Sequence, residues 1–352
     1  MIKEGMPMSK LKAAVLGAGY WGAFQIPSWQ AAGAEVTAVW NRTYERAVAA
    51  AERFGIPQVY ASPEELFEKA DFDIVDIVTA PESHLPLVLM AAGYKKAVIC
   101  QKPMAVTFED SKKMVEACRA AGVWFAVHEN FRYRNAWQKI REIVLSGVLG
   151  KIIRAEINLR SASGDGLIKE PTLAKMDHMA LRDMGPHVFD LTRLLFGEAK
   201  TIYCRNLASR PENGIMDTAV ALLEMRSNAL VKCEICTDKD PGAFISGEKG
   251  ALRFDSEQYI RVYTEDSLDW YEQPKLQKPD YLLEENWRHH GGEGMLSIRK
   301  CIDSMMDSFI KGIPAPTDGE DALKTMELVF SAITSADENI ACNIPEYNEE
   351  AI

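Results

Sequence analysis

An aspartate and a histidine four residues apart, and a lysine before a proline, are the residues of this 352-residue chain best suited to acid–base chemistry. Asp183 and His187 would share one face of a helix, where positions four apart are neighbours. Histidine titrates near neutrality, so His187 could remove the proton of an alcohol while hydride leaves the carbon. Lys102, in Gln101-Lys102-Pro103, follows an apolar run and could orient a substrate hydroxyl. The alternatives are a buried structural histidine and a solvated lysine.

A glycine-rich turn near the start of the chain offers a place for the hydride acceptor. Residues 17–22 read Gly-Ala-Gly-Tyr-Trp-Gly, which is the Gly-x-Gly-x-x-Gly spacing. Gly17 permits a tight strand-to-helix turn, Gly19 lets the backbone approach a pyrophosphate, and Gly22 lets the helix pack closely on the strand. Apolar, strand-like runs lie on both sides of the turn. We therefore predict a nicotinamide or flavin dinucleotide here, against the alternative of an ordinary turn.

The end of the second strand leaves the choice between NAD and NADP open. A carboxylate at this position would accept hydrogen bonds from the adenosine ribose of NAD, but the residue is Asn41, followed by Arg42 and Thr43. An amide can still bond a ribose. Arg42 could hold a 2'-phosphate, stack on the adenine, or lie in solvent.

Composition bounds the class of protein. With 47% hydrophobic residues, the chain is long enough for two domains, and no apolar run is long enough to span a membrane. The polar N-terminus lacks a signal-peptide core, so a cytoplasmic enzyme is expected. The net charge of -11 disfavours nucleic acids and anionic membranes as partners and favours a neutral substrate.

Neither the cysteines nor a histidine pair predicts a metal or redox site. Six of the seven cysteines are scattered through apolar stretches, as in a reducing compartment. Cys233 and Cys236 form a Cys-x-x-Cys within a predicted strand, where residues three apart point to opposite faces, so we expect unreactive thiols. His289 and His290 have no third ligand nearby in the sequence and are expected in a loop.

Two domains follow from the pattern of elements. In residues 1–128 strand-like and helix-like segments alternate, which predicts a Rossmann-type doubly wound parallel sheet. Its strands are expected at 12–16, 35–39, 74–78, 97–100 and 124–127. Ser62 and Thr107 are expected helix N-caps, and Pro27 is expected to break or bend the first helix. In residues 129–352 strands at 152–159, 201–206, 218–225, 229–237 and 251–254 predict an open, mostly antiparallel sheet, and helices are expected at 296–310 and 318–338.

Four motifs together resemble the glucose-fructose oxidoreductase, inositol dehydrogenase and rhizopine-catabolism (Gfo/Idh/MocA) family of sugar oxidoreductases. They are the turn at 17–22, the loop Thr79-Ala80-Pro81-Glu82-Ser83-His84, the dipeptide Lys102-Pro103, and Asp-x-Gly-x-His-x-x-Asp at 183–190. The likeness covers nearly the whole chain. It implies a catalytic set of Lys102, Asp183 and His187, and a second domain whose sheet makes homodimers or homotetramers through its outer face.

The resemblance also implies contacts with cofactor and substrate. The cofactor-binding residues are expected to be Gly17, Gly19, Tyr20, Trp21, Gly22, Asn41, Arg42, Thr79, Pro81, His84, Gln101, Lys102 and Asn130. The substrate-binding residues are expected to be Lys102, Asn130, Arg132, Asp183 and His187. Gln101 departs from the family's usual glutamate and removes a negative neighbour from Lys102, and Asn41 is a second departure.

The motifs therefore predict an NAD(P)-dependent dehydrogenase that oxidises a secondary alcohol of a sugar, cyclitol or glycoside, with His187 as general base. Two alternatives stay open. One is redox-assisted glycoside elimination with transient reduction of the cofactor, and the other is a non-catalytic dinucleotide-binding sensor.

Overall fold

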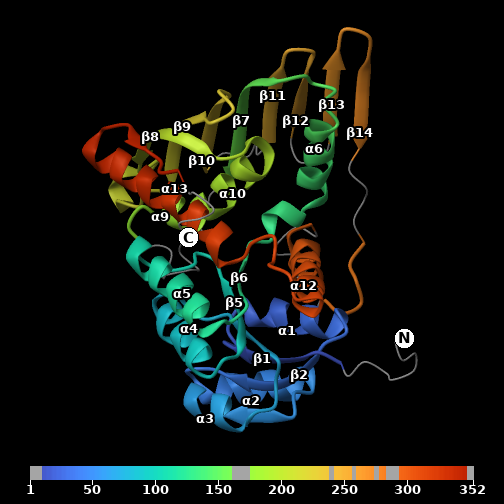
Figure 1. Ribbon diagram of the computed structural model, residues 1–352, viewed down its shortest axis with the longest axis vertical. Coiled ribbons are helices and arrows are strands. Elements are labelled where there is room, and N and C mark those ends of the chain that lie inside the picture. Colours follow the sequence, from blue (N-terminus) through green and yellow to red (C-terminus); the bar gives the residue numbers. More distant parts are fainter. Residues whose placement is uncertain are drawn as a thin grey trace. The chain divides into compact units, whose positions relative to one another are not determined.

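The computed structural model describes residues 10–160, 175–237, 242–255, 259–272, 277–282 and 293–346, which form two compact units (Figure 1). The described parts of Met1–His128 and Gln277–Gly319 make the first unit. Those of Glu129–Leu276 and Glu320–Ile352 make the second. The sequence predicted domains of residues 1–128 and 129–352, and the first compact unit also takes in the described residues of 277–319.

A six-stranded parallel sheet lies at the centre of the first unit. Its strands are β1 (Lys12–Leu16), β2 (Glu35–Trp40), β3 (Gln58–Tyr60), β4 (Ile74–Ile77), β5 (Ala97–Gln101) and β6 (Phe125–His128). The order β3-β2-β1-β4-β5-β6 is that of a Rossmann fold and confirms the predicted class. From β1 to β3 successive strands are added on one side of β1, and from β4 to β6 they are added on its other side. Folds of this kind bind ligands at this switch point, between β1 and β4. Only β3 was missed, because three residues are too few to show a strand period.

Helices cover this sheet. They are α1 (Gly22–Ala31), α2 (Tyr44–Phe54), α3 (Pro63–Lys69), α4 (His84–Gly93), α5 (Phe108–Ala121) and α12 (Glu293–Lys311), with the 3-10 turn η1 (Pro81–Ser83). Both predicted N-caps are present, since the hydroxyls of Ser62 and Thr107 each accept a backbone N–H at 3.1 Å. Pro27 does not break the first helix: α1 continues through it, with Phe24, Ile26 and Trp29 on either side buried in the core.

The described residues of 277–319 join the first unit through packing and backbone pairing. Helix α12 runs beside α1 (Figure 1). The indole N–H of Trp124 donates to the carbonyl of Ile313 at 2.9 Å, and the amide of Val127 donates to the carbonyl of Thr317 at 2.8 Å. These contacts join residues almost 190 positions apart, so local sequence patterns could not reveal them.

A nine-stranded sheet forms the second unit. Its strands are β7 (Ile152–Arg160), β8 (Ala199–Leu207), β9 (Thr218–Met225), β10 (Leu230–Cys236), β11 (Gly242–Gly247), β12 (Gly250–Asp255), β13 (Tyr259–Thr264), β14 (Leu268–Glu272) and β15 (Cys342–Asn343). The order is β14-β13-β12-β11-β7-β10-β9-β8-β15. Its neighbours are antiparallel except β7 and β10, which pair in parallel. The sheet is thus mixed and mostly antiparallel, as predicted.

One face of this sheet carries helices and the other carries exposed side chains. The helical elements are α6 (Asn135–Leu145), α9 (Met179–Asp183), α10 (Gly185–Phe196) and α13 (Gly319–Glu338), with the 3-10 turns η2 (Phe131–Tyr133) and η3 (Pro211–Asn213). Figure 1 shows α10 and α13 lying across the strands. In β10, Cys233 points into the core and Cys236 is half-buried on the other face, as the strand period requires.

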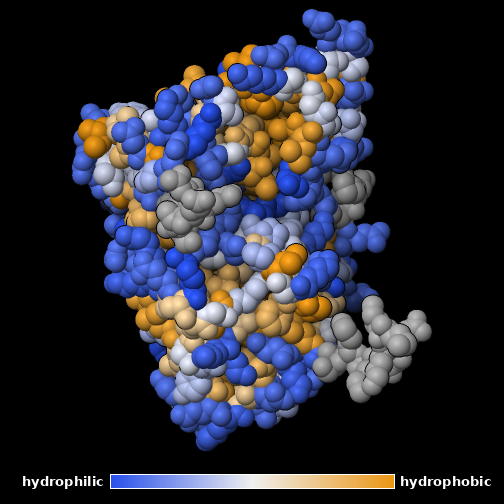
Figure 2. All heavy atoms as spheres, in the orientation of Figure 1, coloured by the Kyte–Doolittle hydropathy of each residue, from blue (hydrophilic) through white to orange (hydrophobic). Residues whose placement is uncertain are grey.

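The described helices include none with both the length and the apolar character needed to cross a bilayer. Figure 2 shows hydrophilic residues over much of one face of each unit, with apolar groups in separate patches.

Candidate active site

The glycine turn joins β1 to α1 and is held by backbone contacts. The amide of Gly17 donates to the carbonyl of Trp40 at 2.8 Å. Gly17 has φ of +116°, and a Cβ built on it would lie 2.4 Å from the carbonyl oxygen of Val78. A Cβ on Gly22 would lie 2.5 Å from the carbonyl oxygen of Gly17. Both positions therefore require glycine for close backbone packing.

The turn fits a dinucleotide at two places. A Cβ on Gly19 would meet nothing within 4 Å, so the backbone there is open to an approaching pyrophosphate. Gln101 ends β5, and its side-chain nitrogen is buried with no hydrogen-bond partner in the part of the chain that the structure describes. A buried donor without a partner is costly unless a ligand accepts from it. The cofactor would thus be held by the turn and Gln101.

Asn41 takes part in building the turn. Its side-chain oxygen accepts the amide hydrogen of Ala18 at 3.0 Å, and its nitrogen donates to the carbonyl of Thr43 at 2.9 Å. This residue therefore fixes the turn against the end of β2. The neighbouring Arg42 is exposed, and the rings of Tyr20 and Trp21 are about half-exposed at the start of α1.

His84 links the two loops that follow β4 and β5. Its Nδ1 lies 3.1 Å from the carbonyl oxygen of Pro103 and 3.2 Å from that of Met104, and its Nε2 lies 3.1 Å from that of Thr79. Burial lowers the pKa of His84, and the carbonyl contacts oppose this effect. The Lys102–Pro103 bond is cis. The ring thus ties the predicted cofactor loop to the backbone beside Lys102.

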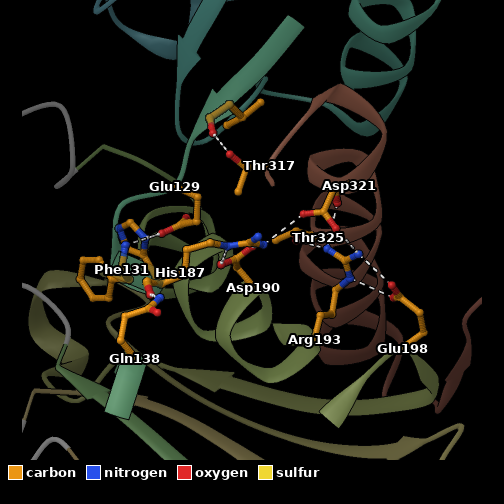
Figure 3. A network of polar contacts seen from close by, with 12 residues as sticks. Glu129, Phe131, Gln138, His187, Asp190, Arg193, Glu198, Thr317, Asp321 and Thr325 are labelled. Carbon is orange, nitrogen blue, oxygen red and sulfur yellow. Dashed lines mark hydrogen bonds and ion pairs between the residues drawn. The ribbon is translucent and has the colours of Figure 1, made fainter. Parts of the chain in front are cut away.

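In the second unit, His187 lies in the first turn of α10 and faces a carboxylate. Its Nδ1 is hydrogen-bonded to Oε1 of Glu129, and both side chains are buried (Figure 3). The ring of Phe131 stacks on the imidazole at a centroid distance of 3.7 Å and an interplanar angle of 9°. His187 is therefore fixed in position and orientation.

Asp183 and His187 lie on two consecutive helices rather than on one. Asp183 is the last residue of α9, and α10 starts at Gly185. Pro186 has no N–H to continue the hydrogen-bond ladder of α9, so the helix ends and restarts here. The expectation that the two residues share a face of a single helix is corrected.

Figure 3 shows Asp190, Arg193, Glu198 and Asp321 in a partly buried network of charges. Arg132 belongs to the same network. Its Nε donates to Asp190 at 2.9 Å, and Nη2 donates to Asp321 at 3.0 Å. Asp321 also pairs with Arg193 at 2.8 Å, and Arg193 pairs with Glu198 at 2.8 Å. Burial raises the pKa of Asp190 to about 6 although Arg132 opposes this. The network holds η2 and α13 on α10.

Glu129 is the residue that sequence reasoning missed. The resemblance implied that residues 128–132 line the nicotinamide and substrate cleft, with Asn130 and Arg132 as the contacts, but it gave Glu129 no role of its own and no partner. The structure places Asn130 at the start of η2, half-buried. A carboxylate directly after a buried strand was the available signal, but its histidine partner lies 58 positions away.

No group of three or more His, Cys, Asp or Glu side chains within the described ranges is arranged to hold a metal ion. His289 and His290 lie outside those ranges.

Comparison with known proteins identifies the chain. Residues 11–129 match the family described as "Oxidoreductase family, NAD-binding Rossmann fold", and residues 137–253 match the GFO/IDH/MocA C-terminal domain. The protein belongs to the GFO/IDH/MocA family. The resemblance inferred from the four motifs is confirmed, and the first unit of this GFO/IDH/MocA protein is an NAD-binding domain.

Several relatives of this GFO/IDH/MocA protein are dehydrogenases. D-apiose dehydrogenase of Rhizobium rhizogenes is 30% identical, with 94% of this chain and 96% of that protein covered. Myo-inositol 2-dehydrogenase of Thermotoga maritima is 25% identical, with 84% and 86% covered. The crystal structure of an Agrobacterium radiobacter oxidoreductase with NAD+, L-tartaric acid and magnesium has a TM-score of 0.88 and 28% identity, with 96% and 99% covered.

Proposed function

We propose that this protein is an NAD-dependent dehydrogenase that oxidises a secondary alcohol of a sugar or cyclitol, with His187 as general base. The named activities of its relatives support the substrate class, since D-apiose and myo-inositol are both polyhydroxylated neutral molecules. The observation that carries the proposal is the buried pairing of His187 Nδ1 with a carboxylate, which is how catalytic imidazoles are commonly oriented. The net charge of -11 also favours a neutral substrate.

The residues act on the alcohol in complementary ways. NAD+, when bound, supplies an acceptor for the hydride that leaves the carbinol carbon. His187 receives the hydroxyl proton on Nε2 as the carbonyl forms. Lys102 donates a hydrogen bond to the substrate oxygen, and Asp183 orients the substrate from the end of α9. Arg132 has a structural role in this proposal, because its guanidinium is occupied by Asp190 and Asp321.

The test replaces His187 with asparagine and follows NADH formation on a panel that includes D-apiose and myo-inositol. Turnover should fall by roughly two to four powers of ten while NAD+ affinity, measured by calorimetry, is retained. His178→Asn is the matched control, and this variant should keep full activity. His178 has φ of +47°, a backbone conformation that asparagine tolerates. Undiminished turnover in His187→Asn would contradict the proposal, and glycoside cleavage without NADH release would indicate redox-assisted elimination.

We also propose that two or four copies associate through the outer face of the nine-stranded sheet. That face exposes Leu222 of β9, Leu230 of β10 and Trp270 of β14, each more than half accessible. Leu222 and Leu230 lie on neighbouring strands, while Trp270 lies at the far edge of the sheet, and apolar side chains exposed on a sheet face are typical of an interface between subunits.

A further inference from the structure

Glu129 contacts the imidazole of His187 in a way that fixes which ring nitrogen carries a proton. Its Oε1 accepts the amide hydrogen of Phe131 at 3.1 Å and is also the atom that faces Nδ1 of His187. The amide can only donate, so it favours the ionised, accepting form of the carboxylate. Against an accepting oxygen, Nδ1 must carry the ring proton.

The plane of the imidazole is fixed by stacking on the same short segment. Phe131 lies parallel to the ring of His187, and the guanidinium carbon of Arg134 lies 3.5 Å from the centroid of Phe131. Because both lie this close to the centre of the Phe131 ring, the imidazole of His187 and the guanidinium of Arg134 must occupy opposite faces of that ring. Residues 129–134 thus supply the hydrogen-bond acceptor, the stacking ring and the cation that covers that ring.

The position of His187 in its helix makes a negative neighbour important. It is the third residue of α10, where the N-terminal end of the helix dipole disfavours a cation. A general base becomes an imidazolium when it takes a proton, so the helix alone would oppose the reaction. A buried carboxylate in contact with the ring offsets that effect.

We propose that Glu129 is the positioning residue of the dehydrogenase. It holds His187 as the Nδ1–H tautomer, so that the Nε2 lone pair receives the proton of the substrate hydroxyl, and its charge stabilises the resulting imidazolium. The Nδ1 proton stays on the ring, Glu129 remains ionised, and the imidazolium afterwards returns the substrate proton to solvent. This inference rests on the proposed role of His187.

The experiment uses the full-length protein with NAD+ and the sugar on which it is most active. Glu129→Gln keeps an acceptor oxygen but removes the charge, and Glu129→Ala removes both. Turnover should fall roughly 10-fold to 100-fold in Glu129→Gln and further in Glu129→Ala, with KM within about threefold of the wild type. Glu198→Gln is the matched control, because Glu198 pairs with Arg193 rather than with His187, and its turnover should be unchanged.

A spectroscopic measurement tests the tautomer without relying on turnover. In protein labelled with 15N-histidine, the signals of His187, assigned by their loss in His187→Asn, should show a protonated Nδ1 in the wild type. In Glu129→Ala they should move toward the Nε2–H form. A protonated Nε2 in the neutral wild-type ring would overturn the inference even if neither Glu129 variant folds.

The two proposals fail in different ways. If Glu129→Gln and Glu129→Ala both turn over within twofold of the wild type while His187→Asn is inactive, Glu129 has no positioning role and the proposed function stands. If His187→Asn is fully active, the proposed function itself is wrong.

Discussion

At the scale of single residues, the three glycines of the turn have different tasks. Gly17 and Gly22 are required by the protein's own backbone, since an added Cβ would lie within 2.5 Å of a carbonyl oxygen. Gly19 has open space in the same test, so the fold itself does not require glycine there. Its small size is useful only if a ligand packs against it.

We predict that Gly19→Ala weakens NAD+ binding without destabilising the protein. The methyl group would stand where the pyrophosphate approaches, and the NAD+ dissociation constant measured by calorimetry should rise about 10-fold or more, which corresponds to roughly 1.4 kcal/mol. The melting temperature should stay at the wild-type value. Gly93→Ala is the control, because a Cβ on Gly93 would also meet open space but this residue lies at the end of α4. It should change neither the NAD+ dissociation constant nor the melting temperature. An unchanged dissociation constant in Gly19→Ala would place the pyrophosphate elsewhere.

At the scale of elements, α1 and β4 share a buried carboxylate. Asp76 is fully buried in β4, and the indole N–H of Trp29 in α1 donates to its Oδ2 at 2.7 Å. Its Oδ1 has no hydrogen-bond partner among the described residues. Burial therefore raises the pKa of Asp76 to about 7, and the indole contact opposes this only in part.

This pKa makes the stability of the first unit depend on pH. Between about pH 4 and pH 7 the unfolded chain releases the Asp76 proton while the folded protein keeps it, so the free energy of unfolding falls as the pH rises. Above about pH 7 the folded protein carries a buried charge. Each pKa unit corresponds to about 1.4 kcal/mol.

We predict that Asp76→Asn flattens this dependence. In denaturant unfolding at about pH 5 and about pH 8, the variant should lose less stability with rising pH than the wild type. Asp71→Asn is the control: Lys12 lowers the pKa of the Asp71 carboxylate, so Asp71 is ionised in the folded and the unfolded protein at both pH values, and its removal should leave the pH profile parallel to that of the wild type. Parallel pH profiles for Asp76→Asn and the wild type would show that Asp76 is ionised throughout.

At the scale of the whole molecule, the open face of the nine-stranded sheet is where the proposed association of copies can be tested. Leu222 is 56% exposed and Leu230 is 61% exposed, and they lie on the neighbouring strands β9 and β10. We predict that Leu222→Lys shifts the protein to smaller assemblies in analytical ultracentrifugation, since burying an unpaired ammonium is costly. NADH formation by the dissociated species should continue if each copy holds a complete site.

A second exposed leucine provides the comparison. Leu145 is 67% exposed at the end of α6, away from the strands, so Leu145→Lys should leave the assembly unchanged. If Leu222→Lys sediments like the wild type, the copies do not associate through this part of the sheet.

The sequence determined the features that depend on neighbours along the chain. The Rossmann strands and the caps at Ser62 and Thr107 follow from local periodicity and side-chain hydrogen bonds, and the glycine turn follows from spacing. The motifs around Lys102 and His187 also identified the family. In all these cases the residues that determine the feature lie within one short segment, so the sequence of that segment is enough to predict it.

The tertiary structure decided what depends on residues far apart in the chain. It paired Glu129 with His187, enclosed Arg132 between Asp190 and Asp321, and placed the described residues of 277–319 with the first unit. It also paired β7 with β10 in parallel. Each of these outcomes depends on which surfaces become buried against each other when the chain folds, and no local pattern of polarity or spacing encodes that choice.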